Sequence, residues 1–251
     1  MVRVLMCGCY GQMGRTITQM VEKEEEMEIV AGVDLITEGP ATYPVFSSVE
    51  ECDVPVDVII DFSSSKTTDS LLEYCVKTNT PVVLCSTGLS EEQLQKVQDA
   101  STKVAVLKSA NMSLGINLLM KLLKEATAVL GEAGFDIEIV EKHHNRKLDA
   151  PSGTALALAD SVNEAAGNKY HYVYDRSQRR ERRDVSEIGI SAVRGGSIVG
   201  DHDVIFAGQD EVITFSHTAY SRALFAKGAV SAAKFLAGKE AGFYTMQDVI
   251  G

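Results

Sequence analysis

The first half of the chain alternates short apolar runs with segments of helical periodicity. Several of the runs are continuous stretches of Val, Ile and Leu, typical of strands in a parallel sheet that helices cover on both faces. The predicted strands are 2–7, 28–34, 56–62, 81–86 and 103–109, and the predicted helices between them are 11–25, 66–77 and 90–100. This repeated strand–helix order predicts an α/β domain with a Rossmann-like, doubly wound parallel sheet.

After residue 109 the pattern changes to longer helices and strands that cluster late. The last two strands are separated only by residues 208–210, so they are expected to be antiparallel neighbours. The predicted elements are helices 114–130 and 152–166 and strands 136–143, 187–194, 198–207 and 211–218. They indicate a second α+β domain built on a mixed sheet. A last helix, 221–238, is expected to return to the first domain, giving residues 1–111 plus 222–251 for the first domain and 112–221 for the second.

Charge and composition limit the partners. The 251 residues include 24 Lys and Arg against 35 Asp and Glu, a formal net charge of −11 at pH 7. This excess of acid excludes a general nucleic-acid binder, which needs a basic surface. With 45% apolar and 24% charged residues the chain has the composition of a globular protein.

The cysteines predict neither a disulfide framework nor a metal site. They are odd in number and no Cys-x-x-Cys spacing occurs among Cys7, Cys9, Cys52, Cys75 and Cys85.

The opening residues predict a strand rather than a signal peptide, and no run approaches the roughly 18 apolar residues of a membrane span. We therefore expect a cytoplasmic protein with no membrane partner.

A glycine-rich turn, GCYGQMGR at 8–15, joins the first predicted strand to its helix. Glycines there let the backbone approach a pyrophosphate, which helix N-terminal N–H groups then hold. No Lys-Ser or Lys-Thr follows the last glycine, so the alternative phosphate loop fails. Asp34 ends the second strand, 20 positions after Gly14, where a carboxylate can bond the ribose hydroxyls of a dinucleotide. The alternative is a tight turn followed by an ordinary loop Asp.

A basic cluster, EKHHNRKLDAPSGT at 141–154, follows strand 136–143 and precedes a predicted helix. In an acidic protein this focus of positive charge suits an anionic substrate. Ser152, Gly153 and Thr154 add backbone donors at the helix start, where a carboxylate binds readily. The alternative is a solvated basic loop with a Ser N-cap.

The segment EKHHNRKLDAPSGTA resembles the catalytic signature of the dihydrodipicolinate reductases, also called 4-hydroxy-tetrahydrodipicolinate reductases, of lysine synthesis. The resemblance extends over the chain through GCYGQMGR, IDFSS at 60–64, CSTG at 85–88, SANMSLGIN at 109–117 and SRALFAKGA at 221–229. It implies a reductase that passes hydride from a reduced nicotinamide to C4 of a cyclic, unsaturated imine dicarboxylate, followed by protonation at C3. It also implies a homotetramer built through the second-domain sheet.

The same resemblance implies roles for individual residues. His143 and Lys147 match the acid/base and proton-donor pair, and His144, Gly153 and Thr154 match contacts to the substrate carboxylates. Ser152 adds to the donors at the helix start, and Arg222 could pair with a carboxylate bidentately or form a surface ion pair. The cofactor-binding candidates are Gly8, Cys9, Tyr10, Gly11, Gln12, Met13, Asp34, Phe62, Cys85, Ser86, Thr87, Ser109, Ala110, Asn111, Met112 and Phe225.

The chain departs from several relatives at Arg146, commonly His, at Gln12, often Arg, and at Cys85, commonly Gly. The cofactor choice depends on Asp34 and the residue after it. A carboxylate here favours a free ribose 2′-hydroxyl and repels a 2′-phosphate. Members that accept the phosphate commonly have Arg or Lys at the next position, where this chain has Leu35. We expect NADH to be the cofactor and NADPH to be weaker, with Arg15 the side chain that could offset the repulsion.

Two other functions remain open: a nucleotide-sensing regulatory protein of the same fold, and a related amino-acid semialdehyde dehydrogenase. Neither requires the basic signature. The stretch from Asp175 to Asp184, which includes the arginines from Arg176 to Arg183, is predicted to be a solvated or subunit-contact loop rather than a nucleic-acid site. His171, His202 and His217 carry no motif, and no function is assigned to them.

Overall fold

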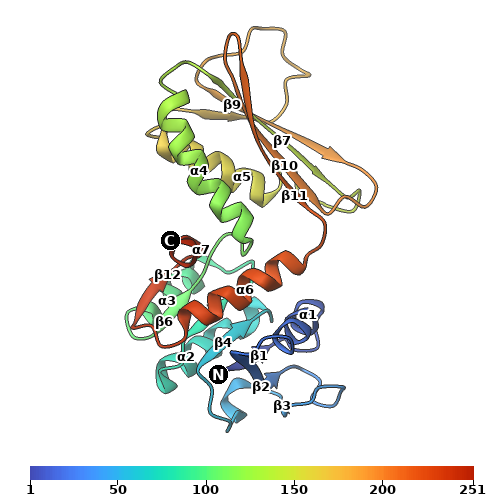
Figure 1. The fold of residues 1–251 in the computed structure, drawn as a ribbon, viewed down its shortest axis with the longest axis vertical. Coiled ribbons are helices and arrows are strands. Elements are labelled where there is room, and N and C mark those ends of the chain that lie inside the picture. Colours follow the sequence, from blue (N-terminus) through green and yellow to red (C-terminus); the bar gives the residue numbers. More distant parts are fainter. The chain divides into compact units, whose positions relative to one another are not determined.

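Seven parallel strands form the sheet of the first structural unit in the computed structural model, which describes residues 1–251 (Figure 1). Their order is β12-β6-β5-β4-β1-β2-β3. The bounds are β1 (Val2–Cys7), β2 (Met27–Val33), β3 (Val45–Phe46), β4 (Val58–Asp61), β5 (Val82–Leu84), β6 (Ala105–Leu107) and β12 (Gly242–Tyr244). The doubly wound parallel sheet predicted from the sequence is confirmed.

Helices cover both faces of this sheet. Their bounds are α1 (Gln12–Val21), α2 (Thr68–Thr78), α3 (Glu91–Ser101), α6 (Ala223–Leu236) and α7 (Met246–Ile250), with 3₁₀ turns at Val49–Glu51 and Ser65–Thr67. On one face, the side chains of Leu5, Ile59 and Val82 pack in one core with residues of α2 and α3. Because side chains alternate along a strand, Met6, Ile60 and Val83 point to the other face, where α6 contacts β4, β5 and β6.

The second unit has a five-stranded mixed sheet of order β11-β10-β7-β9-β8, as predicted. The strands are β7 (Asp136–His143), β8 (His171–Val173), β9 (Glu187–Arg194), β10 (Gly200–Ala207) and β11 (Val212–Ala219). β7 pairs with β9 in parallel and with β10 antiparallel, and β10 and β11 are antiparallel neighbours. Helices α4 (Leu114–Leu130) and α5 (Gly153–Ala165) pack on each other and share one core with the sheet.

The chain crosses between the units twice. The first unit consists of Met1–Ser113 and Ala223–Gly251, and the second of Leu114–Arg222. The assignment of cofactor binding to the first unit, and of substrate binding and oligomerisation to the second, stays a prediction.

Differences from the predicted elements lie at their ends and in the shortest strands. The first helix ends at Val21 rather than at residue 25, because the acidic residues after it are exposed and belong to a turn. The two-residue strand β3, the three-residue strands β8 and β12, and the five-residue helix α7 were not predicted. Segments this short carry too few positions to show a period.

The arginine-rich stretch is tied to the second unit's sheet. Arg183 donates to Glu138 at 2.9 Å and to Asp136 at 2.6 Å, and it also bonds the carbonyl oxygens of Ile137 and Glu187. Arg176 and Arg179 pair with Glu187. These three arginines therefore fasten the loop to β7 and β9. That the loop is solvated or contacts another subunit stays a prediction.

Candidate active site

The inner face of the second unit's sheet changes from apolar to polar along two neighbouring strands. On β7 the buried positions are Ile137, Ile139, Glu141 and His143. On β10 they are Phe206, Val204, His202 and Gly200. Glu141 stands directly opposite His202 in the antiparallel register. The period-2 pattern of both strands therefore brings a carboxylate and two imidazoles together beside the start of α5.

Glu141 is the centre of this polar group. Its side chain is 0% exposed. One carboxylate oxygen, Oε2, lies 2.6 Å from Nδ1 of His143 and accepts from Nη1 of Arg194 at 2.7 Å. The other, Oε1, accepts from Nη2 of Arg194 at 2.7 Å and from the backbone N–H of Ser152 at 3.0 Å. A buried carboxylate with this many donors is fully satisfied.

These donors decide the ionisation of Glu141. Burial raises the pKa of the carboxyl, but the hydrogen bonds from Arg194, His143 and Ser152 outweigh it, and the pKa lies below its ordinary value. Glu141 is therefore a carboxylate at neutral pH. Because a carboxylate only accepts hydrogen bonds, Nδ1 of His143 carries a proton.

His202, to which the sequence assigned no function, packs against His143. The two rings meet edge to face, with centroids 5.1 Å apart. Nε2 of His202 lies 3.1 Å from the Ser152 hydroxyl. Burial, followed by repulsion from a charged His143, lowers the pKa of His202 to about 4, so this ring is neutral at pH 7. His202 stands two positions before Val204 and four before Phe206, on the same face of the strand. This period-2 spacing was the sequence signal that His202 is buried.

The loop after β7 carries the remaining cations. Nζ of Lys147 lies 2.9 Å from Asp149, and the Lys147 N–H donates to the carbonyl of His144. Arg194 donates to the carbonyl of Asp149 at 2.6 Å and so fastens the loop to β9. Burial, and then the charges of Arg146 and Arg222, lower the pKa of His144. Arg222 is therefore within electrostatic range of the predicted substrate-binding residues.

Helix α5 starts at this cluster. Ser152 is its N-cap, with the hydroxyl accepting from the N–H of Ala155 at 3.1 Å. A Cβ added to Gly153 would meet nothing within 4 Å, so the space around the first residue of the helix is open. Thr154 follows in the same turn. The structure thus brings together His143, His144, Lys147, Ser152, Gly153, Thr154 and Arg222 at one end of the second unit.

In the first unit, the glycine turn forms a cradle that fits a dinucleotide. Gly8 has φ +78°, and a Cβ on it would lie 2.6 Å from the carbonyl oxygen of Phe62. A Cβ on Gly14 would overlap the carbonyl oxygen of Gly8. Gly11 is the N-cap of α1 and provides no side-chain cap. Backbone N–H groups at a helix start that lacks a side-chain cap suit a pyrophosphate.

Asp34 is fastened to the same turn. Its Oδ2 accepts from the N–H of Tyr10 at 2.9 Å. Cys9 packs its buried side chain close to Gly32, so only its backbone can face a ligand. Gln12 and Met13 form the first turn of α1 with Gly14.

Asp61, at the end of β4, was missed and connects the next two candidate segments. It accepts from the Ser63 hydroxyl and, at 2.5 Å, from the Ser86 hydroxyl, while its carbonyl accepts from the N–H of Cys85. Burial raises the pKa of Asp61, although these hydrogen bonds oppose the rise. The segments holding Phe62 and Cys85–Thr87 are thereby held side by side. Its place at the end of a predicted parallel strand was the available signal.

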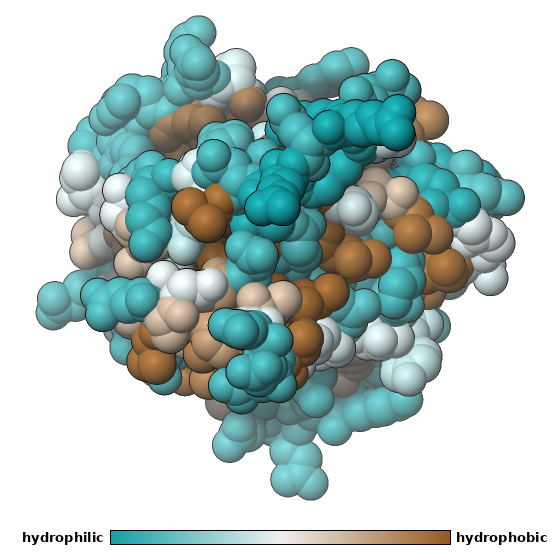
Figure 2. Space-filling view, turned by 90° about the horizontal axis from the view of Figure 1, so that it is seen from above, coloured by the Kyte–Doolittle hydropathy of each residue, from teal (hydrophilic) through white to brown (hydrophobic).

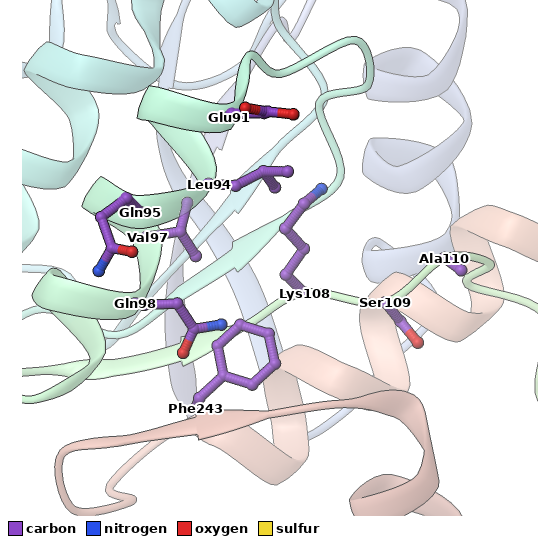
Figure 3. A pocket seen from close by; sticks show the side chains of 9 residues that line it. All are labelled: Glu91, Leu94, Gln95, Val97, Gln98, Lys108, Ser109, Ala110 and Phe243. Atoms are coloured by element: carbon purple, nitrogen blue, oxygen red, sulfur yellow. The ribbon is translucent and has the colours of Figure 1, made fainter.

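The remaining cofactor candidates directly follow β6 or lie on α6. Helix α6 packs closely on the backbone of Met112, because a Cβ on Gly228 would overlap its carbonyl oxygen. Asn111 is buried, and Phe225 lies on the first turn of α6. Ser109 and Ala110 line a pocket of about 600 Å³ together with Lys108, Leu94 and Phe243 (Figure 3). The pocket contains no residue of the basic cluster.

Neither a metal centre nor a membrane helix is indicated. No group of three His, Cys, Asp or Glu side chains is arranged to hold a metal ion. None of the helices combines the length and apolar character that crossing a bilayer requires.

Comparisons with known proteins cover the whole chain. The family models for the N-terminus and the C-terminus of dihydrodipicolinate reductase match residues 2–112 and 115–250. A protein of Caldanaerobacter subterraneus subsp. tengcongensis, called 4-hydroxy-tetrahydrodipicolinate reductase, is 52% identical over 100% of this chain and 98% of its own. One of the same name from Clostridium novyi is 50% identical over 100% of this chain and 98% of its own.

Solved structures show the same fold. The dipicolinate-bound dihydrodipicolinate reductase of Paenisporosarcina sp. TG-14 superposes with a TM-score of 0.83, at 27% identity and 99% coverage of both chains. A myo-inositol dehydrogenase of Corynebacterium glutamicum, 16% identical, has a TM-score of 0.59, covering 99% of this chain and 92% of that one. The second likeness shows the fold alone.

Proposed function

Since the chain belongs to the dihydrodipicolinate reductase family, we propose that it is a 4-hydroxy-tetrahydrodipicolinate reductase. It uses a nicotinamide dinucleotide to reduce a cyclic imine dicarboxylate to tetrahydrodipicolinate in the diaminopimelate route to lysine. The observation that carries this function is the basic loop after β7. The ion pair of the buried Glu141 with the part-buried Arg194 fastens this loop beside the open start of α5.

The cofactor belongs to the first unit. The glycine turn and the start of α1 would hold the pyrophosphate, and Asp34 the adenosine ribose. When bound, the reduced nicotinamide supplies the hydride. The segments held by Asp61, together with 109–112 and Phe225, complete the proposed set of contacts. Because the side chain of the buried Asp61 fixes two of these segments by hydrogen bonds, the site is preorganised.

The substrate dicarboxylate belongs to the second unit. Arg222 supplies positive charge, and the ring of His144 supplies a nitrogen donor. The N–H groups of Gly153 and Thr154 supply further donors at a helix start. Ser152 orients this turn through its bonds to Glu141 and Ala155. His143 and Lys147 are the acid/base and proton-donor pair, so protonation of the ring carbon is assigned to them.

Steady oxidation of reduced cofactor tests this function. The near-ultraviolet absorbance is followed after addition of the cyclic imine, generated fresh by its synthase. The reductase consumes cofactor in proportion to the imine. A protein that binds the dinucleotide without turnover would be a sensor, and one that oxidises cofactor only with an amino-acid semialdehyde would be the related dehydrogenase.

NADH is the preferred cofactor in this proposal. Asp34 is fastened to the turn by Tyr10, so its carboxylate stays where a 2′-phosphate would lie, and Leu35 beside it is 94% exposed and uncharged. Arg15 donates from Nε to the carbonyl of Tyr10 at 2.8 Å, which holds part of its guanidinium at the turn backbone. We expect at least about a tenfold preference in kcat/KM, equivalent to about 1.4 kcal/mol. Equal efficiency of NADPH at matched ionic strength would contradict it.

We also propose a cytoplasmic homotetramer that assembles through the outer face of the second unit's sheet. This face carries Val140, Ile205, Val193 and Val212, the last two exposed. Figure 2, seen from above Figure 1, shows hydrophobic patches among hydrophilic side chains. All five cysteines are unpaired, as in a reducing compartment. A light-scattering mass near 27.1 kDa, that of one chain, would exclude the tetramer.

A further inference from the structure

The imidazole of His143 is held on several sides by groups that the predicted active-site residues do not include. We propose that Glu141 is a positioning residue: its carboxylate binds Nδ1 of His143 and thereby makes Nε2 the nitrogen that gives and takes the proton. The proposal rests on the proposed function, in which His143 acts as an acid/base group.

The first step concerns the tautomer. Oε2 of Glu141 and Nδ1 of His143 are 2.6 Å apart. A carboxylate has no proton to donate, so Nδ1 keeps its proton whether the ring is neutral or charged. The proton that is gained and lost is therefore on Nε2. Without Glu141, both neutral tautomers would be accessible, and in one of them Nε2 could not accept a proton.

The second step concerns rigidity. Arg194 holds both oxygens of Glu141, and the N–H of Ser152 holds Oε1, so the carboxylate cannot rotate away from the ring. These two partners come from β9 and from the start of α5. The orientation of His143 is thus coupled to the same helix start that the proposed function gives to the substrate.

The third step concerns the other edge of the ring. A Cβ on Gly200 would lie 3.0 Å from Nε2 and 3.4 Å from Cδ2 of His143. Only a residue without a side chain leaves the ring its full room at this position. His202 closes another side with an edge-to-face contact. Glu141 and Gly200 therefore act on opposite edges of one imidazole.

Charged and titratable groups from several elements surround the ring of His143. The neighbours of its ring are Arg194 from β9, His202 from β10, and His144 and Lys147 from the following loop. Farther out, His217 of β11 stands opposite His202, and Asp149 pairs with Lys147. Glu141 is the anion in direct contact with the ring. Its loss would make a charged His143 less stable.

The first experiment compares Glu141→Gln with Glu138→Gln in the complete enzyme with NADH. Both exchange a carboxylate for an amide on β7, but Glu138 pairs with Arg183 and Arg176 and does not touch His143. For Glu141→Gln we expect kcat to fall about 100-fold, and the alkaline limb of the kcat/KM profile to move about one pH unit lower, with the KM for NADH unchanged. For Glu138→Gln we expect neither change.

A Glu141→Gln enzyme with kcat within about threefold of wild type and an unmoved alkaline limb would overturn the proposal. Failure of the wild type itself to reduce the cyclic imine would instead overturn the proposed function.

The second experiment needs no turnover. Ring nitrogen-15 NMR of the wild type, assigned by the signal lost in His143→Asn, should place the neutral proton of His143 on Nδ1. A proton on Nε2 would overturn the proposal even if Glu141→Gln failed to fold.

Gly200→Ala adds a variant that keeps every charge. Its Cβ would push the ring by a few tenths of an ångström, so we expect kcat to fall about tenfold while the alkaline limb stays in place. Wild-type kcat in this variant would show that the position of the ring is not critical, and would overturn the positioning role.

Discussion

The glycine turn of the first unit and the basic loop of the second are both binding surfaces at a helix start, but they are built differently. The turn is made of backbone, and its parts lie within residues 8–14 plus Asp34. The loop depends on side chains far away in sequence: Arg194 is 53 residues from Glu141, and His202 is 50 from Ser152. A site made of local backbone is therefore visible in a sequence pattern, whereas the distant residues that support a side-chain site are not.

The largest expected effect is on the side-chain site. His143→Ala and Lys147→Ala should each lower turnover by about 10² to 10⁴, the usual contribution of a positioned acid or base. Because both residues belong to the second unit and the glycine turn to the first, the affinity for NADH should change little. Steady-state kinetics and a fluorescence titration with NADH measure the two quantities. Turnover within about threefold of wild type in both variants would remove their role.

The second effect concerns His202 and acid. The folded protein keeps this ring neutral down to about pH 4, whereas an unfolded chain protonates it near its ordinary value of 6.5. The unfolded state therefore binds more protons between these values, and stability is lost as the pH falls through that window. At the lower end of this window, the loss in free energy of unfolding due to His202 reaches about 3 kcal/mol.

Urea unfolding between pH 7 and pH 4.5 checks this, with His202→Gln as the comparison. The wild type should lose more free energy of unfolding over this range than the variant. If both proteins lost the same free energy of unfolding over this range, groups other than His202 would dominate the acid sensitivity of the protein.

The third effect tests the backbone site. Gly14→Ala places a Cβ against the Gly8 carbonyl and the Cys9 backbone, which must shift to make room. We expect the affinity for NADH to fall about thirtyfold, equivalent to about 2 kcal/mol, while a dicarboxylate analogue binds as before. Gly195→Ala is the control, because a Cβ there meets nothing within 4 Å. Unchanged NADH binding in Gly14→Ala would separate the turn from the cofactor.

The smallest effect is on cofactor choice. Leu35→Arg places a cation beside Asp34 on an exposed position, so the preference for NADH should narrow about tenfold or reverse. The ratio of kcat/KM values for the two cofactors measures it. A ratio equal to that of the wild type would show that residues away from position 35 determine how the 2′-phosphate of NADPH is bound.

The sequence was sufficient for the elements whose signals are local. The capping box of α3 follows from a local pattern, Ser90 with Gln93 three positions later, and both of its hydrogen bonds are formed. The five apolar runs predicted as parallel strands likewise each match a strand, although β5 and β6 fill only three residues of theirs.

What escaped prediction depends on contacts between distant segments. Glu141 was noted only as part of a basic motif, although its partners define the site. His202 lacks any motif, and Asp61 looks like the polar end of a strand. In the arginine-rich stretch, Arg183 bonds Glu138 across 45 residues, and only the parallel pairing of β7 with β9 explains why. Strand pairing is not encoded in any one segment, so these contacts require the fold.

The interruption of the first unit by the second also orders events during protein synthesis. When residues 1–113 have left the ribosome, the sheet face that α6 will cover is still exposed, since α6 begins about 110 residues later. At 5 to 20 residues per second, this wait lasts about 5 to 20 s. The second unit is one uninterrupted segment and can complete its core before the first. The portion translated first is thus finished last, and a nascent-chain chaperone has most to protect in that interval.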